Sequence, residues 1–185
     1  MRRQVAFLRA INVGGHIVKM ERLRMIFESL GLKEVETFIA SGNVVFAPAR
    51  GNIAALEQRI EKTLAKELGY EVKTFVRTNA ELADVAECQP FDAARLTPAT
   101  RLFIGFLATE PSREAEENLL SAAGATDEFH IRGREIYWHC HVPGSESKFS
   151  GAKLEKTLGM PTTIRNSNTV KRLVAKYPPA SNTGL

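Results

Sequence analysis

Only two cysteines, Cys88 and Cys140, occur in this chain of 185 residues. Two thiols cannot form the disulfide framework of a small secreted protein, so we expect a cytoplasmic location. Long hydrophobic runs are also missing, because no stretch approaches the roughly 20 apolar residues of a membrane-spanning helix. The basic start followed by a short apolar run has some features of a signal peptide, but Arg9 and Asn12 interrupt the run and no small-residue cleavage site follows. We therefore expect no membrane association.

The familiar phosphate-binding patterns are absent as well. The sequence contains neither GxxxxGK[ST] nor GxGxxG. Ser147 precedes Lys148, which could suggest a Ser/Lys hydrolase, but the sequence gives no basis for an oxyanion hole. No pair of carboxylates and no nucleophile–base couple stands out. We therefore assign no catalytic residue and expect no cofactor, and the sequence leaves open whether the protein is an enzyme.

Positive charge is concentrated near the C-terminus. The formal net charge is +4, yet residues 145–177 contain seven Lys and Arg against two Glu. Such a surface raises the local concentration of anionic partners, which include phosphates and nucleic acid. Lys171, Arg172 and Lys176 would carry nucleic-acid binding through the last helix. The alternative is an ordinary solvated basic face.

The first half has the element order of a ferredoxin-like fold. Residues 5–8 are apolar without interruption, which is typical of a central strand. Ser41-Gly42-Asn43 predicts the turn of a hairpin, and Asn52 is a suitable N-cap for a helix that ends at Gly69. The expected order is a strand at residues 5–8, a helix at 20–30, strands at 35–40 and 44–47, a helix at 53–68 and a strand at 72–77. This is the βαββαβ order.

The second half repeats most of this order. Thr78 and Glu81 have the spacing of a capping box for a short helix, and Arg132-Gly133 marks a hairpin turn. The remaining elements are expected as a strand at 102–107, a helix at 112–123, hairpin strands at 127–131 and 135–142, a helix at 153–158 and a last helix from Asn166 or Ser167 to about 177. We predict an α+β protein with two sequential ferredoxin-like halves packed together. The predicted boundaries are 1–89 for the first half, 90–100 for a linker, 101–177 for the second half and 178–185 for a disordered tail.

A glycine-containing loop joins the first strand to the first helix. The unpaired N–H groups and the dipole of a helix N-terminus attract anions, Gly14 and Gly15 let a ligand approach the backbone, and Lys19 adds a charge. The two glycines are equally consistent with a tight turn. Arg9 ends the apolar strand, so its guanidinium must meet either a ligand or protein acceptors such as a glutamate.

The sequence His139-Cys140-His141 invites a metal-site interpretation. Side chains alternate along a strand, so both histidines would share a face with Tyr137, whereas Cys140 would point to the other face with Trp138. A His-x-His pair needs a third ligand, and none lies nearby in the sequence. We therefore predict no metal site and a buried core thiol at Cys140.

Several segments together are similar to one bacterial family. These are LRAINVGG (residues 8–15), residues 18–20 with 23–24, SGNVVF (residues 41–46), Ser147-Lys148, residues 154–155 with 158–159, and Arg165-Asn166 with Thr169-Val170. They resemble the proteins catalogued as domain of unknown function 1697, and the resemblance spans almost the whole chain. It implies an α+β fold with ferredoxin-like halves, and it brings no established activity.

The resemblance also supplies the candidate ligand-binding residues. They are Arg9, Asn12, Gly14, Gly15, Lys19, Ser41, Gly42, Asn43, Lys148, Arg165 and Asn166. The chain departs from the family pattern at Ala40, where glutamine is common, and at Ser167, where tryptophan is common. A glutamine amide and an indole surface are therefore missing, which would alter the ligand or weaken its binding.

The functional hypothesis is a cleft for an anionic small molecule that bears a phosphate or carboxylate. The arginines and lysines of this set would supply charge, the asparagines and Ser41 would supply hydrogen bonds, and the glycines would allow close backbone approach. Two alternatives remain open: nucleic-acid binding through the basic last helix, and a purely structural role for the shared polar residues. The sequence does not predict the oligomeric state.

Overall fold

Strand β1 (Gln4–Leu8) is buried along its whole length in the computed structural model, as expected for a central strand. The structure describes residues 2–12, 15–39, 42–92, 94, 100–142, 146–147 and 149–180. The chain forms two compact units, which we call unit 1 (residues 1–84 and 172–185) and unit 2 (residues 85–171). Most of the predicted linker, and residues 181–185 of the predicted tail, lie outside the described residues.

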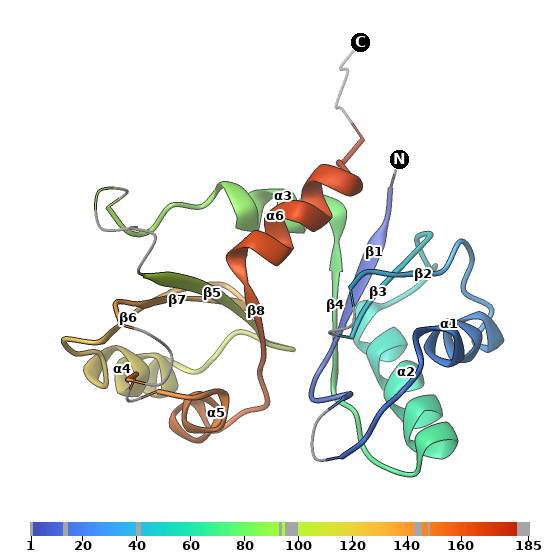
Figure 1. Ribbon diagram of the computed structural model, residues 1–185, viewed down its shortest axis with the longest axis horizontal. Helices are drawn as coiled ribbons and strands as arrows, with labels where there is room; N and C mark the ends of the chain where they lie inside the picture. Colours follow the sequence, from blue (N-terminus) through green and yellow to red (C-terminus); the bar gives the residue numbers. More distant parts are fainter. Residues whose placement is uncertain are drawn as a thin grey trace. The chain divides into compact units, whose positions relative to one another are not determined.

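Unit 1 has the predicted ferredoxin-like order (Figure 1). After β1 come α1 (Met20–Ser29), β2 (Glu36–Thr37), β3 (Asn43–Phe46), α2 (Ile53–Leu68), β4 (Thr74–Thr78) and α3 (Asn79–Glu87). The strands form one antiparallel sheet in the order β2-β3-β1-β4. Leu23 and Phe27 of α1 and Ile60 and Leu64 of α2 pack with Ala6 and other sheet residues in one apolar cluster. The apolar side chains of these two helices therefore bury one face of this sheet.

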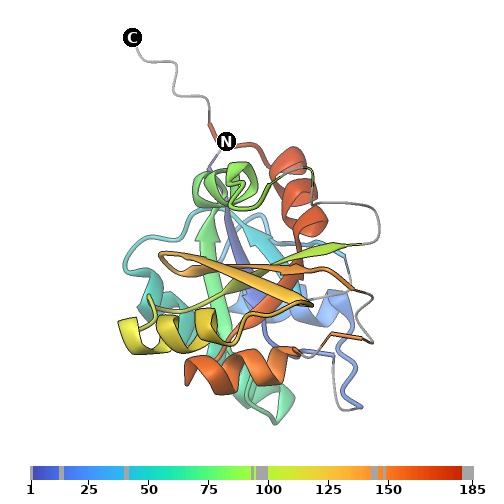
Figure 2. The ribbon, with the colours of Figure 1, turned by 90° about the vertical axis from the view of Figure 1, so that its left-hand side faces the viewer.

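Unit 2 repeats the arrangement. Its elements are β5 (Arg101–Phe106), α4 (Arg113–Ser121), β6 (Asp127–Arg132), β7 (Glu135–Cys140), α5 (Gly151–Leu158), β8 (Thr163–Asn166) and α6 (Ser167–Lys176). The sheet order β6-β7-β5-β8 matches that of unit 1 position by position. Figure 2 shows α4 and α5 side by side along this sheet, and the two helices contact each other. The prediction of two sequential ferredoxin-like halves is confirmed, although β8 was not predicted as a strand.

The two faces of β7 have different surroundings, as the alternation of side chains predicts. Trp138 and Cys140 belong to the apolar cluster that includes Leu119 of α4 and Leu154 of α5. The prediction that Cys140 is a core thiol is thus confirmed. Tyr137 and His139 are also buried, at 1% and 0% exposure, but they lie on the opposite face. Glu128, opposite His139 on β6, lies on this second face as well.

The outer edge of β4 is capped by carboxylates. Arg9 N donates to Lys73 O and Asn79 N donates to Arg3 O. The odd-numbered residues of β4 therefore direct their backbone N–H and C=O groups toward β1. The even-numbered residues Thr74, Val76 and Thr78 direct their N–H groups outward, and each donates to a glutamate, namely Glu61 (3.0 Å), Glu57 (2.7 Å) and Glu81 (2.7 Å). In unit 2, Glu155 of α5 accepts from Thr162 N in the same manner, at 2.8 Å. The outward N–H groups of β4, and that of Thr162 just before β8, therefore have acceptors without a further strand.

Helix α6 begins in unit 2 and its last residues belong to unit 1. Tyr177 donates its hydroxyl to Glu36 Oε2 at 2.7 Å, and Lys176 Nζ lies 3.1 Å from the same oxygen. These hydrogen bonds, that of Tyr177 foremost, lower the pKa of Glu36. Asn79 Nδ2 donates to Tyr177 O at 3.1 Å.

Among the described residues, no helix has both the length and the apolar character needed to cross a membrane.

The predicted capping box at the start of α3 is present, and its loss should be measurable. Thr78 Oγ1 accepts from Glu81 N at 3.1 Å, while Glu81 Oε2 accepts from Thr78 N at 2.7 Å. We expect Thr78→Ala to lower the free energy of unfolding by about 1 kcal/mol, because an N–H of the first turn loses its acceptor. Urea denaturation measures this change. Thr78→Ser is the control and should retain most of the stability; equal losses in both variants would contradict the capping role.

Candidate functional site

The predicted residues of unit 1 gather at one end of its sheet. Because β1 and β3 are antiparallel, the loop that follows β1 lies against the turn that precedes β3. Leu8 N donates to Gly42 O at 2.8 Å, and a Cβ atom on Gly42 would lie only 2.6 Å from Ile11 Cγ2. The loop with Arg9, Asn12 and Lys19 is therefore packed against the turn with Gly42. Gly14 and Ser41 lie outside the described residues.

The asparagines of this group hold the backbone in place. Asn12 Oδ1 accepts from Val18 N at 2.8 Å, which closes the loop before α1. Asn43 is fully buried and its Nδ2 donates to Phe38 O at 3.0 Å. These bonds agree with the structural alternative for the shared asparagines. Lys19, in contrast, is exposed at the N-cap position of α1 and makes no side-chain capping bond there.

The backbone near this group has unusual conformations. Ala10 has a φ of 54° and Ile39 a φ of 50°, in the left-handed region that non-glycine residues rarely adopt. Ala10 follows Arg9 directly. Strain of this kind clusters at functional segments, which favours a functional role for the loop that contains Arg9. Gly15, at φ 87°, has open space around its Cα.

In unit 2, the predicted residues Arg165 and Asn166 lie at the junction of β8 and α6. The Arg165 side chain donates from Nη1 to Thr163 Oγ1 at 2.8 Å and to Ile164 O at 2.9 Å. It is 8% exposed, and burial lowers the pKa of Arg165 to about 10. Asn166 Oδ1 accepts from Asn168 N at 2.9 Å, so Asn166, one of the two residues at which the helix was predicted to start, caps α6. Lys148 lies outside the described residues.

A cavity of about 220 Å³ lies beside this junction, within unit 2. Its residues come from the end of α3 and the segment after it, from β5, and from the first turns of α6. They are Val85, Ala86, Cys88, Gln89, Pro90, Phe91, Leu102, Ile104, Ser167, Val170 and Lys171. Val85, Phe91, Ile104 and Val170 are buried apolar residues. The cavity thus has apolar walls and a few polar groups, which is the usual composition of a small-molecule site.

The electrostatics of the cavity favour an anion. Among the described residues that line it, Lys171 is charged and none is acidic. Ser167 is the first residue of α6, whose N-terminus contributes partial positive charge. Ile104 lines the cavity and is directly opposite Arg165 across the sheet, which places the guanidinium on the same face. The positive charge at the cavity therefore comes from Arg165 at the end of β8 and from Lys171 and the N-terminus of α6, which follows β8 directly.

Tyr137 adds a neutral polar group to this face. Its hydroxyl donates to Val85 O at 3.4 Å. Burial, followed by hydrogen bonding with Cys88, raises the pKa of Tyr137. The phenol therefore stays protonated at neutral pH and does not compete with a bound anion by carrying negative charge.

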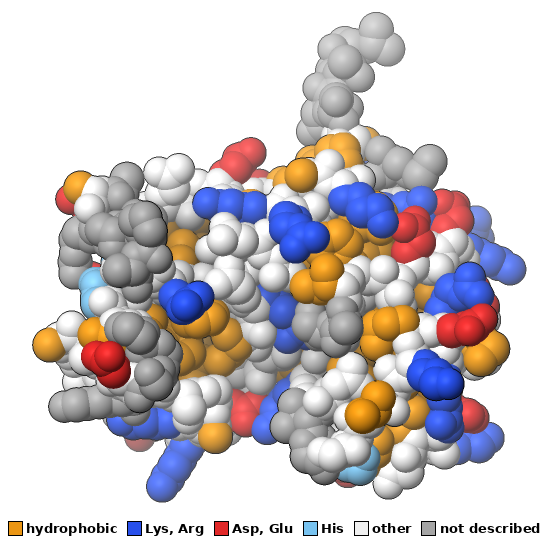
Figure 3. Space-filling model, in the orientation of Figure 1, with side chains coloured by type: hydrophobic (Ala, Val, Ile, Leu, Met, Phe, Trp, Pro, Cys, Tyr) orange, Lys and Arg blue, Asp and Glu red, His pale blue; other side chains and the backbone are white. Residues whose placement is uncertain are grey.

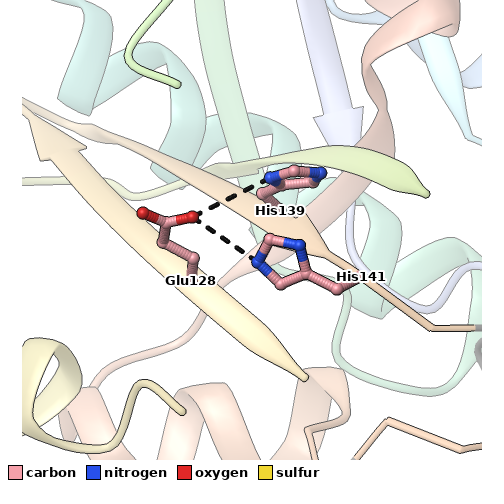
Figure 4. Close-up of side chains that lie close together, drawn as sticks. All are labelled: Glu128, His139 and His141. Carbon is pink, nitrogen blue, oxygen red and sulfur yellow. Dashed lines mark ion pairs between the residues drawn. The ribbon is translucent and has the colours of Figure 1, made fainter. Parts of the chain in front are cut away.

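A second polar cluster on the same sheet consists of Glu128, His139 and His141 (Figure 4). Glu128 Oε2 lies 3.9 Å from His139 Nδ1 and 3.5 Å from His141 Nε2. No third ligand lies near the His-x-His pair in the sequence, but β6 brings Glu128 directly opposite His139. The hairpin turn was the available signal: pairing Arg132 with Glu135 places Glu128 opposite His139, four residues farther along each strand.

Two of the basic residues of α6, Arg172 and Lys176, contact other residues of unit 1. Basic side chains lie over α6 on the face drawn in Figure 3, with acidic side chains near its C-terminal end. Lys176 forms an ion pair with Glu36 at 3.1 Å, and the Arg172 guanidinium lies 5.6 Å from the centre of the Phe38 ring. Nucleic-acid binding through this helix stays a prediction, and of its three proposed residues Lys171 also borders the cavity.

Comparison with known proteins places the chain in a family. The sequence model of a family described as "Protein of unknown function (DUF1697)" matches residues 1–137. The chain belongs to the DUF1697 family. Its structure is similar to that of a conserved bacterial protein from Streptococcus pneumoniae, with a TM-score of 0.74 and 23% sequence identity over 96% of this chain and 98% of that one. No curated protein matches the chain.

Membership in DUF1697 confirms the resemblance read from the sequence, and the family's function is not established. The structural similarity, at 23% identity, shows the shared fold. The match to the family ends at Tyr137, so Arg165, Asn166 and the α6 wall of the cavity lie beyond it. Ser167, identified above as a departure from the family pattern, is a cavity residue. That role has no local signal in the sequence, because the cavity combines segments that are far apart in the chain.

Proposed function

We propose that unit 2 binds a small anionic molecule in the cavity at the start of α6. The observation that carries the proposal is the combination of buried apolar walls with Lys171 as the charged residue among the described lining residues. An apolar part of the ligand would contact Phe91, Ile104 and Val170. Its carboxylate or phosphate would bind Lys171, with the Ser167 hydroxyl as a further hydrogen-bond donor.

The size of the cavity limits the ligand. At about 220 Å³, it is smaller than the roughly 300–1,000 Å³ that is typical of sites for drug-sized molecules. A metabolite with a compact apolar body and one anionic group fits this description better than a dinucleotide. Inorganic phosphate alone would leave the apolar walls without contacts.

Arg9 and Lys19 stay candidate ligand-binding residues in the loop of unit 1. Arg165 contributes positive potential to the cavity face of unit 2. The asparagines have structural bonds in both units, as described above. We therefore base the proposal on the cationic side chains and on the cavity rather than on the complete set of shared polar residues.

Replacing Lys171 by methionine should weaken anion binding about tenfold, which is equivalent to 1.4 kcal/mol, because a charge-assisted hydrogen bond is lost. Benzoate is a suitable probe and benzamide is its neutral counterpart, with binding measured by calorimetry and by shifts in NMR signals of residues 167–171. Ser167→Trp should abolish binding by filling the cavity. Arg172→Met is the matched control, since Arg172 is a neighbouring basic residue that does not line the cavity.

Three results would reject this assignment. Equal binding of benzoate and benzamide would exclude charge recognition, and unchanged binding in Lys171→Met would exclude Lys171. Loss of benzoate binding in Arg9→Ala, with Lys171→Met unaffected, would move the site to the loop of unit 1. A nucleic-acid ligand would behave differently, because Lys171→Met and Arg172→Met would both weaken it and its affinity would fall steeply with salt.

A further inference from the structure

We propose that Glu128, His139 and His141 form a binding site for a divalent transition-metal ion, with Zn²⁺ as the best match. The inference rests on the side-chain cluster shown in Figure 4 and is independent of the anion site proposed above. Two histidines and one glutamate are the protein ligands of one class of catalytic zinc site.

The backbone presents the three ligands from a rigid part of the sheet. His139 and His141 alternate on β7 and its extension, so both project from the same face, and their ring centres lie 4.1 Å apart. Glu128 is directly opposite His139 on β6. Ligands fixed on paired strands lose little conformational freedom when an ion binds, which favours binding.

The distances suit an ion better than direct hydrogen bonds. The carboxylate oxygen lies 3.9 Å from His139 Nδ1 and 3.5 Å from His141 Nε2, whereas a hydrogen bond between such groups would measure about 2.7–3.2 Å. Two ligand atoms held at about 2.1 Å from a tetrahedral Zn²⁺ are separated by about 3.4 Å. All three ligand atoms lie within 4.8 Å of one another, so small side-chain rotations bring them to that spacing.

Burial gives the cluster a closed side and an open side. His139 is fully buried, and the Phe91 ring lies 5.3 Å from its ring, which limits its rotation. The side chains of His141 and Glu128 are 19% and 34% exposed. An ion can therefore reach the site from solvent, and its remaining coordination positions would face water or a small ligand.

The chemistry of the ligands selects the ion. Imidazole nitrogen suits Zn²⁺ and its first-row neighbours, while Mg²⁺ and Ca²⁺ prefer sets of oxygen ligands. Phe91 and Leu102 connect the cluster to the cavity, because both line the cavity, Phe91 contacts His139, and Leu102 is directly opposite His139 on β5. A bound ion would thus lie behind one wall of that cavity.

Calorimetry with ZnCl₂ on the full chain, without a polyhistidine tag, tests the proposal. We expect the unmodified chain to bind one Zn²⁺. In Glu128→Gln and in His141→Ala the dissociation constant should rise at least 10–100-fold, roughly the loss seen when only a residue that supports a metal ligand is removed. His130→Ala is the matched control, because His130 is an exposed histidine on β6 outside the cluster. Cys88→Ser controls for binding to the half-buried thiol.

Co²⁺ substitution supplies a second readout that does not depend on stability. The visible absorption of bound Co²⁺ should indicate nitrogen and oxygen ligands and should disappear in Glu128→Gln, with circular dichroism showing that the variant is folded. Absence of stoichiometric Zn²⁺ binding to the unmodified chain would overturn the proposal. Equal affinity in Glu128→Gln, loss of binding in His130→Ala or Cys88→Ser, or equal competition by Mg²⁺ would overturn it as well.

Discussion

Replacing Asp127 by alanine should lower the free energy of unfolding by about 4 kcal/mol, because it removes a charged acceptor that serves one buried and two half-buried donors. Asp127 is 2% exposed. Its Oδ1 accepts from Trp138 Nε1 and from Ser147 Oγ, and its Oδ2 accepts from Thr126 Oγ1, each at 2.7 Å. The alanine variant would leave the indole N–H of Trp138 in the core without this acceptor.

The same carboxylate should make unit 2 sensitive to acid. Burial alone would raise the pKa of Asp127, but the hydrogen bonds from Thr126, Ser147 and Trp138 outweigh burial and hold the pKa below its ordinary value of 3.8. The unfolded chain therefore binds a proton at a higher pH than the folded chain does. The resulting stability is complete above about pH 5 and is lost as the pH falls through the folded-state pKa.

Urea denaturation followed by Trp138 fluorescence measures both effects. Trp138 is the one tryptophan of the sequence, so the signal reports directly on the neighbour of Asp127. Asp127→Asn is the control: it keeps an acceptor oxygen and should cost less than Asp127→Ala, and its stability should change less between pH 6 and pH 3. The same acid dependence in Asp127→Asn and in the unmodified chain would show that other groups are responsible.

Gly42→Ala should lower the free energy of unfolding by about 3 kcal/mol, the largest expected loss after that of Asp127→Ala. The left-handed conformation of Gly42, at φ 71°, costs a residue with a side chain about 1–2 kcal/mol. The added Cβ would also lie 2.6 Å from Ile11 Cγ2 and 3.2 Å from Leu8 Cβ, and overpacking of this kind typically costs about 1–3 kcal/mol.

Gly31→Ala separates the two contributions. Gly31 also has a positive φ, 80°, but a Cβ there would meet nothing within 4 Å. We expect a loss of only about 1 kcal/mol at Gly31, measured by the same denaturation experiment. If the two variants were equally stable, packing against Ile11 would not explain the requirement for glycine at position 42.

Most of the fold could be predicted because its signals are local. The capping residues Asn52 and Thr78 marked two helix starts that the structure shows. Strand β8 escaped prediction because residues 163–166 include only one apolar side chain, Ile164, and the strand is held by distant pairing with β5. A four-residue segment of this composition has no periodicity to read.

The candidate sites could be predicted only in part. Arg165 and Asn166 were identified from the family resemblance, but the cavity beside them depends on packing among α3, β5 and α6, which no local pattern encodes. The histidine pair was visible in the sequence, whereas its carboxylate partner required the register of the β6–β7 hairpin. Residue types can be read from the sequence, but the contacts between distant segments depend on tertiary structure.

The glutamates along β4 also affect how copies of this protein can associate. An intruding chain that tried to extend the sheet at this edge would need the amide groups of Thr74, Val76 and Thr78. Those groups already donate to the molecule's own carboxylates. Edge-to-edge association through β4 would therefore require three hydrogen bonds to be broken first. The negative charges of the displaced glutamates would also repel those of the next copy.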